Sequence, residues 1–444
     1  MWVICRTRFI QIMLFNFDSF NKIIHEIYFP KSPSFPNLQK NRISMRASVF
    51  AFIFFISVAS GKAQDHKESN YDEAKVPQYT LPDVLRTQAG KTVTNKNQWE
   101  KARRPEVLRL FEDNIYGQLP TDYDSIRYTL SHENAKSMNG KAHLKEVLIE
   151  VFRHGKSVKI NLVLFIPNNA LKPAPAFLLI NNRGKDQSDP SRTVKSEFWP
   201  AEEAIEAGYA IAAFHVSDLA PDDPKLFMNG ALQLYPEQLS SDNGMRAIGA
   251  WAWGASRVMD YFQKDPLIDK ERVAIVGHSR GGKASLWAAA QDERFALCIT
   301  NCSGSTGAKL ARREFGERIR RINSSFPHWF NTNYKKFNDK ESLLPVDQHM
   351  LIGLIAPRPL YATNATEDLW ADPKGTFLAL KNAEDVYNLY RLKSALGPEP
   401  PAPNSVIIQS PLGYHNSIGI HNMTAFDWNN FIKFADYHFK KKSK

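Results

Sequence analysis

The chain has 444 residues, of which 43% are hydrophobic and 23% charged, and its formal net charge is +11 at pH 7. This composition is typical of a globular protein with a large core, and it excludes a disordered or fibrous chain. Much of the positive charge lies near the N-terminus, where residues 1–63 carry eight Lys and Arg but two acidic residues. The rest of the chain has a net charge of +5, which gives no reason to expect a nucleic-acid partner.

Residues 1–63 combine a targeting segment with extra sequence that precedes it. From Met45, one Arg precedes an apolar stretch of about a dozen residues and then small residues up to Ala63, which is the order of a signal peptide and too short for a membrane span. We therefore predict a misassigned upstream extension at 1–44 and a signal peptide at 45–63; a genuine N-terminal anchor or extension is the alternative. The mature chain is expected to be exported to the periplasm or secreted, monomeric and without stable membrane association.

A polar, charged linker is expected at 64–78, followed by a single catalytic domain at 79–444. Residues 98–116 have the periodicity of an amphipathic helix, and residues 125–130, 145–153 and 157–166 alternate as strands, with the last two joined in a hairpin at 154–156. From residue 176 strands and helices alternate: strand 177–181, helix 200–207, strand 209–214, helix 243–262 and strand 273–276. This order predicts an α/β fold, a mainly parallel sheet flanked by helices in three layers.

The motif Gly277-His-Ser279-Arg-Gly281 follows the apolar strand at 273–276 and precedes the helix-forming residues 284–291. This is the pattern of a nucleophile elbow, in which glycines allow the crowded turn that exposes a serine Oγ, and it predicts an α/β-hydrolase with Ser279 as nucleophile. The alternative is a glycine-rich loop whose serine only caps the helix.

Two cations, Arg280 and Lys283, occupy the first turn of this helix, where the macrodipole favours acidic residues. Lys283 lies four residues after Ser279, so both side chains are expected on one side of the elbow, facing sugar hydroxyls or a developing oxyanion. The alternative is two solvated surface charges. A second oxyanion donor is expected from the loop at 181–186, without a choice of residue.

The acid and base of a hydrolase triad follow later strands. A strand at 359–366 is followed by Glu367, Asp368 and Asp372, and a predicted last strand at 405–410 is followed by a loop with His415, which we expect to be the base. Three other histidines are weaker candidates for the base: His215 at a strand end, His349 in an apolar helix and His421 at the start of the closing helix.

The motif Gly277-His-Ser-Arg-Gly-Gly-Lys283 is similar to the Gly-Cys-Ser-Arg-x-Gly-Lys signature of glucuronoyl esterases, carbohydrate esterase family fifteen. The resemblance to bacterial members spans roughly residues 78–440 and includes the segments 291–295, 326–329, 344–349, 355–359 and 367–373. It implies Ser279 as nucleophile, His415 as base and Arg280 at the oxyanion. It also implies that Lys283, Glu317 and Trp370 contact a uronic acid ring.

The chain departs from the family pattern at two places. His278 replaces the usual cysteine of the signature and is expected to be a packing neighbour. The loop at 300–307, where many members carry the triad Glu, has no carboxylate, so the acid is expected from the later loop at 367–372. The resemblance implies Asp368, which matches the family's alternative acid, with Glu367 as second candidate.

Only two cysteines, Cys298 and Cys302, lie beyond residue 63, and neither a disulfide framework nor metal-ligand spacing is expected. Trp329, Phe330 and Trp370 fall in loops near the expected site, with Trp370 favoured for stacking on a sugar, whereas Trp251 and Trp253 are expected in the core.

We thus expect a serine esterase without cofactor or metal, acting on glucuronate esters between glucuronoxylan and lignin. The alternatives are an acetylxylan or broader carbohydrate esterase and a non-catalytic glycan-binding protein.

Overall fold

A computed structural model describes residues 69–170 and 173–440. The expected extension, the signal peptide and the first residues of the expected linker lie outside these described residues. The described residues all belong to one compact unit. Its ten strands are β1 (Ser125–Ser137), β2 (Ala142–Arg153), β3 (Lys156–Pro167), β4 (Ala174–Asn181), β5 (Ala210–His215), β6 (Ile268–His278), β7 (Leu297–Asn301), β8 (Leu360–Ala365), β9 (Val406–Ile407) and β10 (Leu412–Ser417).

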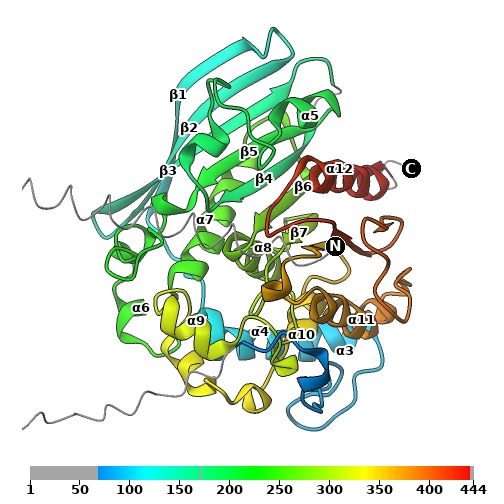
Figure 1. Ribbon diagram of the computed structural model, residues 1–444. Coiled ribbons are helices and arrows are strands. Elements are labelled where there is room, and N and C mark those ends of the chain that lie inside the picture. Colours follow the sequence, from blue (N-terminus) through cyan, green and yellow to red (C-terminus); the bar gives the residue numbers. More distant parts are fainter. Residues whose placement is uncertain (1–68, 171–172, 441–444) are drawn as a thin grey trace, which may run out of the picture. The chain divides into compact units, whose positions relative to one another are not determined.

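The strands form one sheet in the order β1-β2-β3-β5-β4-β6-β7-β8-β10-β9, seen in Figure 1 as the layer between the helices. β1, β2 and β3 are antiparallel neighbours, and β3 pairs antiparallel with β5. From β5 through β4, β6, β7 and β8 to β10 every pairing is parallel. The sequence therefore predicted the mainly parallel sheet and the β2–β3 hairpin correctly, and this strand arrangement is that of an α/β-hydrolase.

The helices lie on both faces of the sheet (Figure 1). They are α3 (Lys96–Gln98), α4 (Arg104–Phe111), α5 (Ala201–Glu206), α6 (Glu237–Ser240), α7 (Ala247–Phe262), α8 (Arg280–Gln291), α9 (Ile319–Ser325), α10 (Gln348–Gly353), α11 (Pro373–Leu389) and α12 (Ala425–Lys440), with α3 and α4 continued by π-helical turns at Trp99–Arg103 and Glu112–Tyr116. Together, the helical segments from Lys96 to Tyr116 correspond to the helix predicted at 98–116.

Each face of the sheet has its own hydrophobic core. Alternate residues of β4 point to opposite sides, with Leu178 and Ile180 in the larger core and Phe177 and Leu179 in the smaller one. Helices α4, α7, α8, α10 and α11 contribute to the larger core, whereas α5 and α12 contribute to the smaller one. Trp251 and Trp253 of α7 are buried in the larger core, as predicted. The two layers fix the parallel strands, whose carboxyl ends carry the loops of the site.

The last strand differs from the prediction, and the difference moves a histidine. The segment expected as the final strand, 405–410, forms only the short antiparallel β9. The last parallel strand is β10, which pairs with β8 and contains His415. The loop that follows the last parallel strand is therefore the segment after Ser417, and the histidine in that loop is His421. The short run at 405–410 is apolar enough to resemble a strand, but its place in the sheet is decided by pairing.

Residues 69–78 were expected to belong to a linker, but part of this segment packs on the catalytic unit. The backbone carbonyl of Asn70 accepts a hydrogen bond from the amide of Gly316 at 2.7 Å. Tyr71 lies edge-on to Phe315, with ring centroids 6.2 Å apart, and Glu73 forms an ion pair with Arg313 at 2.5 Å. We call residues 70–73 the N-terminal strap.

Among the described residues, no helix is both long and apolar enough to cross a membrane.

Candidate active site

Ser279 lies at the sharp turn between β6 and α8, with φ 54° and ψ −124°. A positive φ is unfavourable for a residue with a Cβ, and such strain of about 1–3 kcal/mol persists only where the surrounding structure holds it. Helix α8 begins at Arg280, and the Ser279 side chain makes no capping hydrogen bond to it. The helix-cap alternative for this serine is therefore wrong, and its backbone has the strained conformation of a nucleophile elbow.

The two glycines of the motif are required by close backbone contacts. A Cβ on Gly277 would overlap the carbonyl group of Gly281. A Cβ on Gly281 would lie 2.8 Å from Oδ1 of Asn182 and 3.0 Å from the carbonyl oxygen of Ile180, on the neighbouring strand β4. The spacing Gly-x-Ser-x-Gly thus follows from packing the start of α8 against β4 and β6.

Ser279 opens into a pocket of about 350 Å³ at the carboxyl ends of the parallel strands. Six of the seven predicted site residues line this pocket, and His415 does not. The lining residues are Ser279, Arg280, Lys283, Cys302, Ser303, Gly304, Glu317, Arg321, Ser325, Phe326, Trp329, Asp368, Trp370 and His421. The pocket brings together loops that are far apart in sequence, so the grouping is a property of the tertiary structure.

The histidine in this pocket is His421. Its Nδ1 lies 2.6 Å from Oδ2 of Asp368, which is itself 5% exposed, whereas the side chain of His421 is 38% exposed and reaches the pocket. Asp368 lies in the loop after β8, as expected for the triad acid, and its neighbour Glu367 is exposed to solvent. Because Nδ1 is bonded to a carboxylate, Nε2 is the ring nitrogen left for a reacting group.

His415, which was expected to be the base, is placed elsewhere. Its side chain is completely buried within β10; Nδ1 accepts a hydrogen bond from the Tyr361 hydroxyl at 2.8 Å, and Nε2 is paired with Asp427 at 2.7 Å. With both nitrogens occupied and no exposure to the pocket, it cannot reach Ser279. The prediction for His415 is wrong because the strand boundary was placed too early, so that a strand residue was taken for a loop residue.

The other competing histidines have structural positions. His349 is buried, and Nε2 bonds to the carbonyl of Pro82 at 3.0 Å. His215 bonds to the carbonyl of Arg183 at 2.6 Å and to the Ser217 hydroxyl at 2.6 Å. Neither lines the pocket with Ser279.

His278 packs against the pocket histidine. The centroids of its ring and the His421 ring are 4.6 Å apart, and the ring is fully enclosed between Phe198, His421 and the strands. Burial, with the neighbouring His421 as a further cause, lowers the pKa of His278 well below the ordinary value, so the ring is neutral at pH 7. Nε2 lies 3.2 Å from a guanidinium nitrogen of Arg183, which can only donate, so Nδ1 carries the proton. His278 is thus a packing neighbour of the pocket histidine, as expected.

Cys302 occupies the loop after β7, the loop in which no carboxylate was found. It has φ 48°, is 2% exposed and lines the pocket beside His421 and Asp368. Burial, together with the nearby carboxylates of Asp368 and Asp427, raises the pKa of this thiol well above the ordinary value. The thiol is therefore protonated at neutral pH and lies against the Asp368 side chain.

Arg280 is held by an aspartate that no sequence motif marks. Its guanidinium forms an ion pair with Asp222 and lies over the ring of Trp329, 5.1 Å from the centroid. Asp222 also accepts hydrogen bonds from Trp329 Nε1 at 2.7 Å and His328 Nε2 at 2.9 Å. Burial alone would raise the pKa of Asp222, but His328, Arg280 and Trp329 outweigh it and lower the pKa to about 2. Asp222 lies in an irregular segment after β5, where sequence patterns carry little information about contacts.

Lys283 is buried rather than solvated, so the surface-charge alternative is wrong for this residue. Its ammonium group donates to the carbonyl of Ser303 at 2.8 Å, to the carbonyl of Ser305 and to Oε2 of Glu317 at 2.7 Å. Burial lowers its pKa, while the Glu317 carboxylate opposes this shift. All three N–H groups are used, so Lys283 fixes the loop at 303–305 and orients Glu317.

The aromatic candidates divide between pocket and core. Trp370 and Trp329 line the pocket, and Trp329 is stacked on Phe326 with ring centroids 3.8 Å apart. Phe330 is 2% exposed and packs against Tyr116 and Tyr334, so it belongs to the core and not to the site. Trp370 is only partly buried, which leaves its ring accessible.

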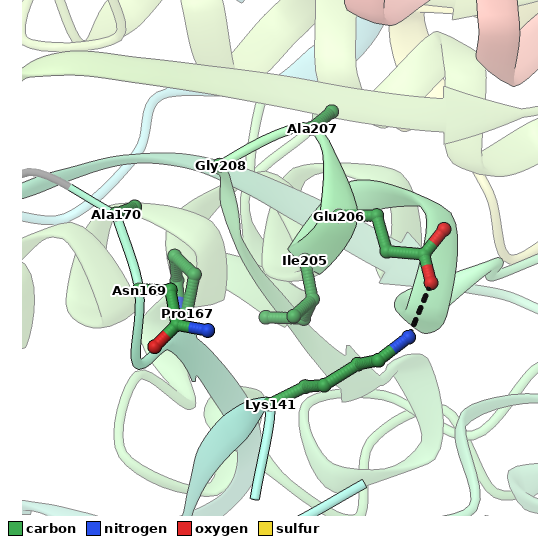
Figure 2. A pocket seen from close by; sticks show the side chains of 8 residues that line it. All are labelled: Lys141, Pro167, Asn169, Ala170, Ile205, Glu206, Ala207 and Gly208. Atoms are coloured by element: carbon green, nitrogen blue, oxygen red, sulfur yellow. Dashed lines mark hydrogen bonds and ion pairs between the residues drawn. The ribbon is translucent and has the colours of Figure 1, made fainter.

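A second pocket of about 310 Å³ lies between the start of β2, the end of β3 and α5. Figure 2 shows Lys141 pointing across it to Glu206, with which it forms an ion pair at 2.7 Å. Both side chains are 59% exposed. The residues that line this pocket include no serine, cysteine or histidine, so it is not a competing candidate for the active site.

Comparison with known proteins agrees with this geometry. A family model described as "Glucuronyl esterase, fungi" matches residues 149–390, more than half of the chain. The chain belongs to the glucuronoyl esterase family. The matched region includes the elbow, the Lys283–Glu317 pair and Asp368, whereas His421 lies beyond its end.

Relatives of the chain include bacterial and fungal esterases. "Carbohydrate esterase MZ0003" from an unknown prokaryotic organism is 42% identical over 83% of this chain and 92% of its own length. "4-O-methyl-glucuronoyl methylesterase 1" of Phanerochaete chrysosporium is 31% identical over 69% of this chain and 61% of that protein. Among solved structures, a promiscuous family-fifteen esterase from a marine bacterial metagenome has a TM-score of 0.77 and 40% identity, covering 83% of this chain and all of that one. A glucuronoyl esterase of Solibacter usitatus has the same TM-score and coverage at 37% identity. The chain is thus a carboxylic ester hydrolase with the α/β-hydrolase fold.

Proposed function

We propose that this chain hydrolyses esters of glucuronic acid or 4-O-methylglucuronic acid carried by glucuronoxylan, including those to lignin alcohols. The observation that carries the proposal is one pocket that holds Ser279 in the elbow conformation together with the bonded pair His421 and Asp368. The names of curated family members, 4-O-methyl-glucuronoyl methylesterases, support the uronate as the acyl part.

In the proposed mechanism, Ser279 Oγ attacks the C6 carbonyl carbon of the uronate ester while Nε2 of His421 accepts its proton. Asp368 holds Nδ1–H and stabilises the imidazolium that forms. The imidazolium then protonates the leaving alcohol, and a glucuronoyl-enzyme remains on Ser279. Water, deprotonated by His421, hydrolyses this ester and restores the free serine.

The negative charge that develops on the carbonyl oxygen lies beside Arg280. The amide of Arg280 is the first of α8 and has no acceptor within the helix, so it can donate to the oxyanion. The guanidinium is held in place by Asp222 and lines the same pocket. In the loop at 181–186, the Arg183 amide is already bonded to Asn181 Oδ1 at 2.9 Å, so the second donor is a different group.

The uronic acid ring is proposed to contact Glu317 and Trp370. Oε2 of Glu317 is bonded to Lys283, and its other carboxylate oxygen can accept a hydrogen bond from a ring hydroxyl. The apolar face of the sugar can stack on the accessible ring of Trp370. Lys283 acts through Glu317, because its three donors are taken by the protein.

The test compares initial rates on benzyl glucuronate, methyl glucuronate and acetylated xylan, for the wild type and for Ser279→Ala. We expect hydrolysis of the glucuronate esters by the wild type and none above background by Ser279→Ala. Higher kcat/KM on acetylated xylan would support the alternative of a broader carbohydrate esterase. Absence of hydrolysis of any ester would support the non-catalytic alternative.

We also propose that the enzyme is exported, with a signal peptide at 45–63, because a polymeric plant cell-wall substrate lies outside the cell. The expected state is a monomer. N-terminal sequencing of the exported protein tests this proposal, and a start before Met45 would contradict it.

A further inference from the structure

Cys302, Asp368 and His421 form a cluster that the esterase mechanism does not fully use. One ligand atom of each residue, a thiol sulfur, a carboxylate oxygen and an imidazole nitrogen, lies within 4.8 Å of the other two. The three residues come from the loops after β7, β8 and β10, and all three line the pocket with Ser279. The mechanism needs the Asp368–His421 pair, but it assigns no reaction step to the thiol.

The three donor types match the ligands that zinc prefers. Zn²⁺ binds cysteine sulfur, histidine nitrogen and aspartate oxygen with bond lengths of about 2.0–2.3 Å, so in a tetrahedral site the ligand atoms lie roughly 3.3–3.7 Å apart. His421 Nδ1 and Asp368 Oδ2, now 2.6 Å apart, would have to separate by about 1 Å. The imidazole side chain is 38% exposed, so it has room for this movement.

We propose that Zn²⁺ binds to Cys302, Asp368 and His421 Nδ1 and thereby inhibits the enzyme, with a pocket water as fourth ligand. The thiol loses its proton to solvent and binds as a thiolate. The proton on His421 Nδ1 moves to Nε2 by way of solvent, so that Nδ1 can donate its lone pair to the metal while the ring stays neutral. Nε2–H then cannot accept the proton of Ser279, and the nucleophile is no longer activated.

Zinc differs here from hard cations such as Mg²⁺, which prefer oxygen ligands in octahedral geometry. A single carboxylate beside a thiol and an imidazole does not offer such a site. The proposal therefore predicts selectivity for zinc over magnesium, and dependence on the sulfur of Cys302.

The chain provides a matched control in its other described cysteine. Cys298 is also buried, but its sulfur faces the carbonyl of Ser285, and it does not line the pocket. Initial rates on benzyl glucuronate are measured against Zn²⁺ and Mg²⁺ concentration, and each variant is normalised to its own rate without metal. Half-inhibitory zinc concentrations are compared for the wild type, Cys298→Ala, Cys302→Ala and Cys302→Ser.

We expect the wild type and Cys298→Ala to share one half-inhibitory zinc concentration, and both Cys302 variants to need on the order of tenfold more. Mg²⁺ should not inhibit. Equal inhibition of the wild type and the Cys302 variants, or no zinc inhibition of the wild type up to millimolar concentrations, would overturn the proposal.

A second measurement does not depend on activity. Co²⁺ is added to Ser279→Ala, which keeps the three ligands, and thiolate-to-cobalt charge-transfer absorption is recorded in the near ultraviolet. The band should appear in Ser279→Ala and be lost in Ser279→Ala/Cys302→Ser and in Ser279→Ala/His421→Ala. A missing band, or one that persists without Cys302, would contradict the site even if the proposed esterase activity were confirmed. Failure of the esterase proposal would leave this spectroscopic result unaffected.

Discussion

Nδ1 of His421 lies 2.6 Å from Oδ2 of Asp368. The ring of His278 packs against the same imidazole, with the two ring centroids 4.6 Å apart. The carboxylate selects the tautomer with the proton on Nδ1, and the neutral His278 ring packs against one side of the imidazole. The pair thus has the two properties that a general base beside Ser279 needs, an available Nε2 and an orientation set by the Asp368 hydrogen bond.

Alanine at His421 should lower kcat on a glucuronate ester by several orders of magnitude, because this side chain is proposed to accept the proton of the reacting serine. Alanine at His415 should instead destabilise the fold by about 1–3 kcal/mol, because it leaves buried Asp427 and Tyr361 without their partner. Kinetics and urea unfolding of both variants measure these effects. An active His421→Ala would remove this residue from the mechanism.

The substitution Asp368→Asn should cost far more activity than Glu367→Gln. The neutral amide would not stabilise the imidazolium and would favour the wrong tautomer of His421, whereas Glu367 is exposed and its backbone amide makes the contact with Gly419. The comparison uses kcat/KM of the two variants on the same ester. The reverse order of activities would identify Glu367 as the acid.

Neutralising Glu317 should affect both binding and stability. In Glu317→Gln the buried ammonium of Lys283 loses its counter-ion, at a cost of about 3–5 kcal/mol. The sugar hydroxyl then meets a neutral amide in place of a carboxylate, which is a weaker acceptor, so KM rises. In Lys283→Met/Glu317→Gln the uncompensated charge is removed as well, so part of the stability should return while KM stays high. If KM of the double variant equals that of the wild type, the pair has no role in binding the sugar.

Asp222 should make stability depend on acid pH. Its pKa is about 2 in the folded protein, below the ordinary value, so its contribution is present above about pH 4 and is lost as the pH falls toward 2. The contribution amounts to about 2 kcal/mol. Urea unfolding of the wild type and Asp222→Asn at several pH values should show the difference between them shrink over this range. A constant difference would mean that the carboxylate is not the source.

Truncation should separate the N-terminal strap from the residues before it. A chain that begins at Gln64 should fold and hydrolyse esters, whereas one that begins at Tyr79 should have a lower Tm and a higher KM. The strap bonds to Gly316, and Glu317 follows directly after Gly316. The strap also pairs with Arg313, which in turn contacts Asp372 at 2.9 Å. Its removal should therefore disturb both the fold and the position of Glu317. Steady-state kinetics and thermal unfolding of the two chains provide the measurement. If the two chains have the same Tm and KM, the strap is only a linker.

Local sequence determined the elbow, because the strand, the two close-contact glycines and the helix are all set within a short continuous segment of the chain. It also placed Asp368 correctly in the loop after β8, since a parallel strand and the residues after it form a local unit. The alternation of strands and helices predicted the parallel sheet. None of these inferences needed a long-range contact.

Tertiary structure decided which histidine meets Asp368. His415 and His421 are close neighbours in the sequence, and their positions depend on whether 405–410 or Leu412–Ser417 pairs with β8. That choice is made by packing across the sheet, with Tyr361 and Asp427 enclosing His415, and not by the pattern of the segment itself. Asp222 and Cys302 enter the pocket region for the same reason: loops distant in sequence meet at the carboxyl edge of a parallel sheet, and sequence spacing does not record that proximity.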